Sequence, residues 1–468
     1  MKWLIGLALW SLPAFAQAQG TLTIEQYLMQ VQSQNFQARS LVTAIESAEM
    51  RVREPETVEG TEFYASYNVF DDSKQAAQPK IMGTETEGSV WRLGLRKETS
   101  FGLGANLYFN SQRTVIHNAS PLFLDNPDYN EARTVLELRQ SLWRNGFGAT
   151  TRNNIAAKRA AIDTELSESR SQLKNFLFDA KNVYWALVSY NQIVKLQEEN
   201  VGRARLMRNR MSRGEKLRLF DDTDAMQSEA AFQSRDLELQ TSLDERAKLV
   251  RQFNTLRGLN SDESPQLEGL PVKEFTLDDK GSGKMRRDDF DALRARARGA
   301  VAMAEGAVSQ IRPQLDLTAS FAGNGRDGLT SKSHELATTD KYPSWSVGLM
   351  FSIPIDVNLI LDVKRGYRAR AKSAREMEAM ADFNEERVWQ DLVKQRKEAF
   401  GRYQRAIGVE KIQTELVVRE RRRLSNGRAT TFEALSIEQG LALAQIQRVR
   451  AELAFMQIHN AIKTFEVK

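Results

Sequence analysis

Two patterns of hydrophobic and polar residues follow one another along this chain, and each predicts a different kind of secondary structure. Residues 61–70, 89–112 and 134–143 alternate apolar and polar side chains, which is typical of strands with two different faces. Between residues 153 and 213 the apolar side chains instead recur every seven positions, in two offset rows. Such rows are the seam of a coiled coil, and they predict a single helix about 90 Å long. The rows are Leu166, Leu173, Ala180, Leu187, Val194 and Val201, and Ile162, Phe176, Val183, Tyr190, Ala204 and Met211.

The same succession of elements then occurs a second time. A helical segment at 288–310 is followed by alternating segments at 314–323 and 345–355, and a long helix is predicted from 363 to 426. Ala186 and Ala399, like Tyr190 and Tyr403, lie 213 residues apart at matching places in the two halves. We therefore interpret the chain as an internal repeat of helix, strands and long helical hairpin.

Each predicted hairpin reverses direction at a turn of similar sequence. The first turn reads RMSRGEKLRLFDDTDAMQSEA from Arg210, and the second reads RLSNGRATTFEALSIEQ from Arg423. Glycine commonly ends a helix in the left-handed conformation, so Gly214 and Gly427 are predicted to end the two long helices. The tips of the hairpins are thus expected near residues 214–224 and 427–433.

The beginning of the chain predicts export from the cytoplasm. Lys2 precedes an apolar run from Trp3 to Leu12 and an Ala-x-Ala site, so residues 1–18 are predicted to be a secretory signal peptide. The first repeat then spans residues 19–260, a linker or equatorial segment spans 261–285, and the second repeat spans 286–468. The chain has no cysteine, which excludes a disulfide framework and a lipid attached to cysteine.

Charge and composition narrow the classes of function. The net charge is +5, from 66 Lys and Arg against 61 Asp and Glu, and the two signs are interspersed. Interspersed charges indicate solvated helix faces rather than a nucleic-acid surface. The three histidines have no spacing that suggests a metal site, and no residue pattern indicates a cofactor. We therefore expect neither an enzyme nor a nucleic-acid partner.

The predicted strands are too few to enclose a lumen in one chain, and left open they would expose unpaired edges. Association of several copies solves this problem for the strands and for the helix seams. We consider two classes of protein: an outer-membrane conduit, and a soluble periplasmic coiled-coil scaffold or adaptor. The scaffold shares the signal peptide and the heptads but does not predict aromatic-rich strands in both repeats.

At this point the residues resemble a known family. The segments NFQARSLVTAIESAEMRVREP and RRDDFDALRARARGAVAMAEGAVSQIRPQLDLTASFAG, the junction WSVGLMFSIPI and a spaced pattern in the second turn carry the resemblance. Together, twice in the same order, they resemble the TolC-like outer-membrane efflux and secretion channels (outer membrane efflux proteins) over essentially the whole mature chain. The spaced pattern consists of Gly427, Thr430, Glu433, Leu435 and Glu438.

The resemblance implies a fold, partners and a location. The fold class is mainly α with β, in which long helical hairpins form an α-helical barrel and strands form a trimeric β-barrel. Each chain of the homotrimer would give four strands to a twelve-stranded barrel in the lipid of the outer membrane of a Gram-negative bacterium. The hairpin tips would meet a periplasmic adaptor, or membrane fusion protein, joined to an inner-membrane RND, ABC or MFS transporter.

The resemblance also implies site residues. The acid at the constriction of the family's second tip corresponds to Glu433, and the first tip aligns Asp224, although Asp221 and Asp222 stand beside it. The alternative for both is an ordinary acid in the first turn of a helix. Other residues of the two turns are candidate contacts with the adaptor: Arg210, Ser212, Gly214, Arg423, Ser425, Gly427 and Thr430. The substrate, the pump, and whether residues 89–112 add strands to the barrel are left open.

Overall fold

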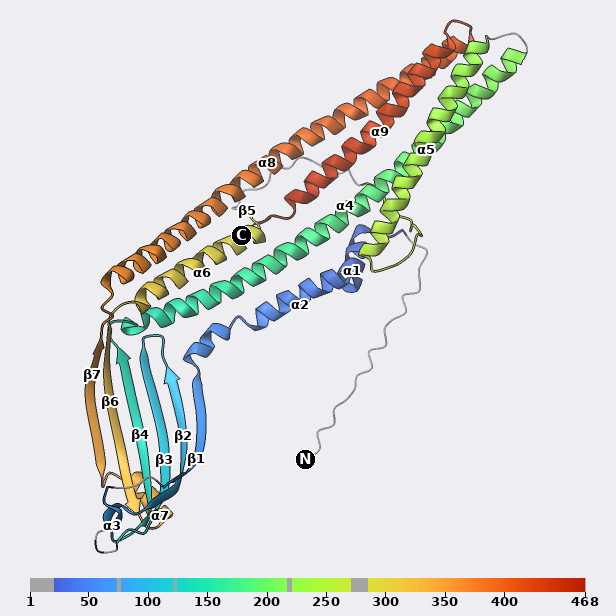
Figure 1. Ribbon diagram of the computed structural model, residues 1–468. Coiled ribbons are helices and arrows are strands. Elements are labelled where there is room, and N and C mark those ends of the chain that lie inside the picture. The colour runs from blue at the N-terminus through green and yellow to red at the C-terminus, as the bar shows by residue number, and fades with distance from the viewer. Residues whose placement is uncertain are drawn as a thin grey trace. The chain divides into compact units, whose positions relative to one another are not determined.

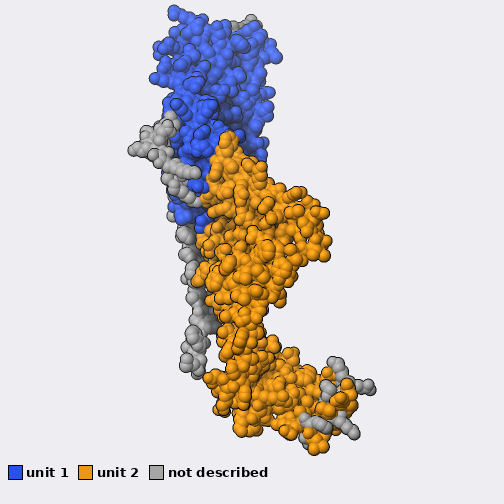
Figure 2. Space-filling model, turned by 90° about the vertical axis from the view of Figure 1, so that its left-hand side faces the viewer, with its two compact units in different colours: residues 1–44, 169–287, 385–468 blue, residues 45–168, 288–384 orange. Residues whose placement is uncertain are grey.

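The computed structural model describes residues 21–467 apart from 74–76, 121, 123, 217–220 and 271–284. The predicted signal peptide and most of the predicted linker therefore lie outside the described residues. The chain forms two compact units, coloured separately in Figure 2. One comprises residues 1–44, 169–287 and 385–468, and the other comprises residues 45–168 and 288–384. Each unit draws on both sequence repeats.

Helices make up most of the chain, and their bounds follow the predicted periodicity closely (Figure 1). The heptad rows are confirmed, since Leu187 and Met211 are fully buried and Ile162, Val194 and Val201 are nearly so. The helices longer than eight residues are α1 (Ile24–Gln34), α2 (Phe36–Met50), α4 (Ala149–Lys216), α5 (Asp222–Leu256), α6 (Asp288–Gln310), α8 (Val357–Ser425) and α9 (Thr431–Ile462).

The core of the first unit is aromatic. Tyr27 of α1 stacks on Phe253 of α5 with ring centroids 4.3 Å apart, and it also contacts Tyr184 of α4 at 5.5 Å. Tyr403 and Phe455 extend this cluster from α8 and α9. Elements from both repeats therefore share one core, which binds the two hairpins together.

The prediction that Gly214 ends the first long helix is wrong. Helix α4 continues through Gly214 to Lys216, and α5 begins at Asp222. Arg213, Glu215 and Lys216 are good helix formers, and one interior glycine costs only about 1 kcal/mol against alanine. By contrast, Gly427 has φ of +67° and lies in the turn that follows α8, as predicted.

The strands form one six-stranded antiparallel sheet in the order β1-β2-β3-β4-β6-β7 (Figure 1). The β2–β3 hairpin predicted at residues 89–112 pairs along its whole length with β1 on one side and β4 on the other. The expectation of four strands per chain is therefore wrong, because this hairpin lies inside the sheet. The strands are β1 (Thr61–Asp72), β2 (Glu85–Glu98), β3 (Leu103–His117), β4 (Asp128–Ser141), β6 (Gln314–Asp327) and β7 (Pro343–Ser352).

Short elements complete the described chain. The helix α7 (Thr330–Ala337) packs against β4 and β6. A Cβ on Gly325 would come within 2.0 Å of the Ser333 carbonyl oxygen, so glycine is needed for this close approach. The others are η1 (Glu54–Glu59), η2 (Gly146–Gly148), α3 (Pro79–Met82) and the paired strands β5 (Met285–Arg286) and β8 (Glu466–Val467).

Candidate functional site

One face of the sheet is apolar, and every strand exposes large side chains on it, although α7 covers part of this face where His334 packs against Trp91 and Phe109. The pairing register aligns a single row across all six strands, from Phe63 through Leu95, Leu107, Leu136 and Phe321 to Trp345. Water-exposed sheet faces are normally polar, and an apolar patch of this extent marks an interaction surface. The large apolar side chains on this face are 36–76% exposed. They are Phe63, Tyr67, Val69, Leu93, Leu95, Leu107, Leu136, Leu138, Leu317, Phe321, Trp345, Val347, Leu349 and Phe351.

The opposite face of the same strands carries a polar network. Arg96 of β2 pairs with Glu62 of β1 at 2.6 Å. On β4, a carboxylate oxygen of Glu137 accepts a hydrogen bond from the Asn106 amide at 3.1 Å, and the other accepts from the Tyr108 hydroxyl at 3.0 Å. These cross-strand contacts pair the polar groups of this face with one another. The apolar row on the other face, from Phe63 to Trp345, contains no charged residue.

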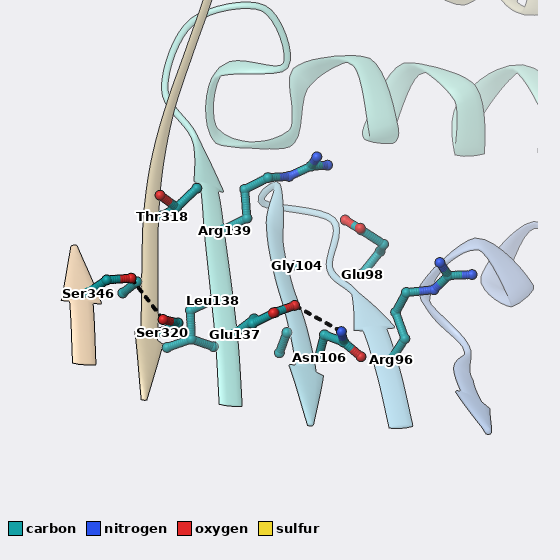
Figure 3. A pocket seen from close by; sticks show the side chains of 12 residues that line it. Arg96, Glu98, Gly104, Asn106, Glu137, Leu138, Arg139, Thr318, Ser320 and Ser346 are labelled. Atoms are coloured by element: carbon teal, nitrogen blue, oxygen red, sulfur yellow. Dashed lines mark hydrogen bonds between the residues drawn. The ribbon is translucent and has the colours of Figure 1, made fainter. Parts of the chain in front are cut away.

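The network lines a shallow groove of about 500 Å³ on the polar face. Figure 3 shows the groove, with the Asn106–Glu137 hydrogen bond and, two strands further along, the Ser320–Ser346 hydrogen bond at 2.8 Å. Arg139 and Glu98 also line it. The groove is polar and open, and its polar side chains alternate along the strands with the apolar side chains of the other face.

The turn between α8 and α9 is stabilised by hydrogen bonds between its own residues. The amide of Arg428 donates to the carbonyl of Arg423 at 2.8 Å, just after Gly427. Thr430 caps α9: its hydroxyl accepts from the Glu433 amide at 3.2 Å, while the Glu433 carboxylate accepts from the Thr430 amide at 2.8 Å. This is a capping box.

The capping box determines the electrostatics of Glu433. The side chain is fully exposed, and the hydrogen bond from the Thr430 backbone holds the pKa of the Glu433 carboxyl below its usual value, with a smaller contribution from Arg423. The structure therefore places this residue in the first turn of a helix, where an acid stabilises the turn. Its carboxylate remains exposed beside the turn, so the two interpretations of Glu433 are compatible.

The first turn is built differently. Asp221 caps α5 and accepts from the Asp222 amide at 2.8 Å. Asp222 and Asp224 lie in the first helical turn, where Asp224 is half-buried and the other two aspartates are exposed. Residues 217–220, which join α4 to α5, lie outside the described residues.

The two turns lie side by side, since the Thr431 hydroxyl is 3.6 Å from the Met211 sulfur. Of the candidate contact residues, Arg423 binds Glu420 at 3.0 Å and the Arg428 carbonyl at 3.2 Å, which holds it within its own turn. Arg210 is exposed, Ser212 is half-buried, and the Ser425 hydroxyl bonds the Arg422 carbonyl.

Sequence reasoning did not find the groove beside these turns. A hollow of about 330 Å³ lies between α4, α5 and α9, and its lining includes Arg203, Arg235 and Glu438. Phe432 stands at its edge and is 66% exposed. An aromatic side chain at the second position of α9 was the available signal, because acidic residues are enriched in the first turn of a helix.

Two properties of the described residues bear on the site. Among the described residues, His, Asp and Glu side chains form no cluster that could hold a metal ion. None of the described helices combines the length and the apolar character that crossing a membrane requires.

Comparison with known proteins gives a match in structure. No protein-family model and no curated protein sequence matches the chain. The outer membrane protein VceC of Vibrio cholerae matches at a TM-score of 0.62 and 12% identity, covering 94% of this chain and 95% of that one. The CmeC outer membrane channel of Campylobacter jejuni matches at 0.60 and 12%, covering 94% and 84%.

The open state of the MtrE outer membrane channel of Neisseria gonorrhoeae also matches, at a TM-score of 0.59 and 11% identity, with 94% of this chain and 88% of that chain covered. This chain has the fold of the TolC-like outer-membrane channels. The resemblance inferred from the repeats is thereby confirmed for the fold, and the proteins that share it are channels rather than enzymes.

Proposed function

We propose that the chain assembles as a homotrimeric channel in the outer membrane and exports substrates from the periplasm together with a periplasmic adaptor and an inner-membrane transporter of the RND, ABC or MFS class. The observation that carries the proposal is the sheet, with an exposed apolar row across six strands and a polar network behind it. Lipid on one side and water on the other suit these two faces.

The helices support the association of copies. The long helix α8 exposes apolar side chains along its length, including Met380, Phe383, Ile412 and Val418, each more than 50% exposed. Exposed apolar side chains of this kind mark a surface that suits packing against another helix. A second copy of the chain supplies such a helix without any further partner.

Fractionation tests this proposal. The mature protein is expected in outer-membrane detergent extracts, with the mass of a trimer by native mass spectrometry. A monomer released with the soluble periplasm would contradict the proposal and favour the scaffold alternative. Crosslinking in cells before extraction should capture an adaptor, and its identity would then indicate the class of transporter.

We propose further that Glu433 and Asp224 lie at the periplasmic mouth of the channel, and that the exposed groups of the two turns contact the adaptor. Three copies of an acid near a narrow opening would favour cations and make the closed state sensitive to salt. The proposal for Glu433 rests on its exposed carboxylate beside the turn.

Two matched variants separate charge from capping at this position. Glu433→Gln keeps a side chain that completes a capping box but removes the charge, whereas Thr430→Ala keeps the charge and removes the cap. We expect Glu433→Gln to change leak conductance and cation preference in planar bilayers more than Thr430→Ala does. Equal conductance of Glu433→Gln and the unchanged protein would leave Glu433 as a capping residue only.

A further inference from the structure

The β2–β3 hairpin is an integral part of the sheet. Strand β1 pairs with β2 along all twelve of its residues, from Thr61 opposite Lys97 to Asp72 opposite Thr86. Strand β3 in turn pairs with β4 from Leu103 to Val115. A four-stranded contribution would require β1 to pair with β4 directly, and the hairpin occupies that position.

The hairpin has the same two faces as the strands around it. Leu95 and Leu107 continue the apolar row between Phe63 on β1 and Leu136 on β4. One position away, Arg96 lies opposite Asn106 on the polar face. A hairpin at the rim of a barrel, surrounded by water, would have no reason to maintain this alternation in register with its neighbours.

Each edge strand of the sheet is suited to pair with the opposite edge strand of a second copy of the chain. Six strands in antiparallel succession leave β1 and β7 running in opposite directions. They contain 12 and 10 residues, and every residue of β7 is exposed. In the described chain neither strand has a partner on its outer side. Unpaired edges of this length are normally covered, and an antiparallel neighbour of matching length is available in a second copy.

We propose that the outer-membrane part of this channel is an eighteen-stranded barrel, in which β1 of each copy pairs antiparallel with β7 of the next and three copies of the six-stranded sheet close the ring. This inference rests on the trimer proposed above. An even number of strands per copy is what allows every pair in such a ring to be antiparallel. An odd number would force one parallel pair at each junction between copies.

The consequence is a wider exit. With strands about 4.8 Å apart and tilted by about 40°, eighteen strands give a backbone diameter of about 36 Å, against about 24 Å for twelve. Barrels of 16–18 strands leave an open aqueous channel. In this protein the polar network around Arg96, Glu62 and Glu137 would line that channel, so the strands would not form its narrowest part.

Electron microscopy of the detergent-extracted full chain tests the inference directly. A cross-section through the barrel is expected to show eighteen strands and a backbone diameter near 36 Å. Twelve strands in a trimer would overturn the inference but leave the proposed channel intact. A soluble monomer would overturn the proposed function, and with it the barrel, so the two failures are distinguishable by mass and by strand count.

A deletion provides a matched second test. Removing residues 85–117 excises both strands of the hairpin, and because β1 and β4 run antiparallel they can then pair with each other. The variant is expected to form a twelve-stranded barrel, with the diameter reduced by about one third and the helical part unchanged. A deleted trimer with the diameter of the full chain would contradict the inference. If the variant does not fold, the strand count of the full chain by electron microscopy remains the test of the inference.

Discussion

The sheet and the helical turns satisfy their polar and apolar groups in opposite ways. The turn at Gly427 is complete within a few residues, because Thr430 and Glu433 bond each other and Arg423 binds its own turn. The sheet leaves an apolar face and two edges exposed. Local sequence therefore determines the second turn, whereas the sheet leaves surfaces that lipid and other copies would cover in the proposed channel.

The largest expected effect on stability comes from a charge placed on the apolar face of the sheet rather than on the polar face. Arginine in place of Val347, on the apolar face of β7, should destabilise the membrane-inserted trimer by about 2–4 kcal/mol per copy near the bilayer centre. The neighbouring Ser346→Arg places the same charge on the polar face and should cost far less. The yield of folded trimer in outer-membrane extracts measures both. Equal loss for the two variants would contradict the assignment of the faces.

The second prediction concerns acid sensitivity of the helical core. Burial, with Lys463, Arg396 and Lys181 nearby, lowers the pKa of His459 to about 4. The unfolded chain, with a pKa of about 6.5, binds the proton more readily between these values. Stability is therefore full above pH 6.5 and falls as the pH drops toward 4.

At pH 5 this loss should amount to about 1–2 kcal/mol, after allowance for the partial exposure of the ring. Thermal unfolding followed by circular dichroism at 222 nm at pH 7.5 and pH 5 measures it. His459→Gln is the control and should show a smaller difference between the two values of pH. An unchanged difference in that variant would assign the acid sensitivity to other groups.

The third prediction tests whether the second turn depends on its cap. Thr430→Ala should cost about 1 kcal/mol at the start of α9, which corresponds to about fivefold faster hydrogen exchange of the amides in its first turn. Glu433→Gln should leave that exchange nearly unchanged. If the two variants exchange equally fast, the capping box contributes little to the turn.

The smallest expected effect on stability is the loss of the cap at the first turn, which has fewer capping hydrogen bonds than the second turn. Asp221→Ala removes a cap that bonds only the next amide, so it should cost about 0.5 kcal/mol, at the low end for such caps. Asp224→Ala should cost less still. Hydrogen exchange at the start of α5 measures both. A larger effect of Asp224→Ala would show that Asp224, rather than Asp221, stabilises the start of this helix.

The sequence predicted the elements well and their arrangement less well. The bounds of α6 were predicted to the residue, because helix periodicity and helix ends are local signals. Gly214 was assigned wrongly, since the tendency of its neighbours to form helix outweighs one glycine. The pairing of β4 with β6, which joins the two repeats, depends on residues almost 200 positions apart, and no local pattern encodes it.

For the candidate sites, too, the sequence predicts local positions better than contacts between distant residues. The first-turn positions of Glu433 and Asp224 could be expected from the sequence, whereas the capping bond of Glu433 and the contact between Thr431 and Met211 require the folded chain. The polar network behind the apolar row was likewise not foreseen. Its members, such as Arg96 and Glu62, are 34 residues apart, and only the register of the sheet shows that they meet.

The hairpin of β2 and β3 also bears on how such proteins diversify. In the proposed ring, two strands added together to the middle of the sheet leave the edge strands β1 and β7 with their directions unchanged, and so leave the antiparallel pairing between copies unchanged. Duplication or loss of one short stretch of gene would therefore alter the circumference of the proposed barrel in fixed increments, without any accompanying change at the contacts between copies.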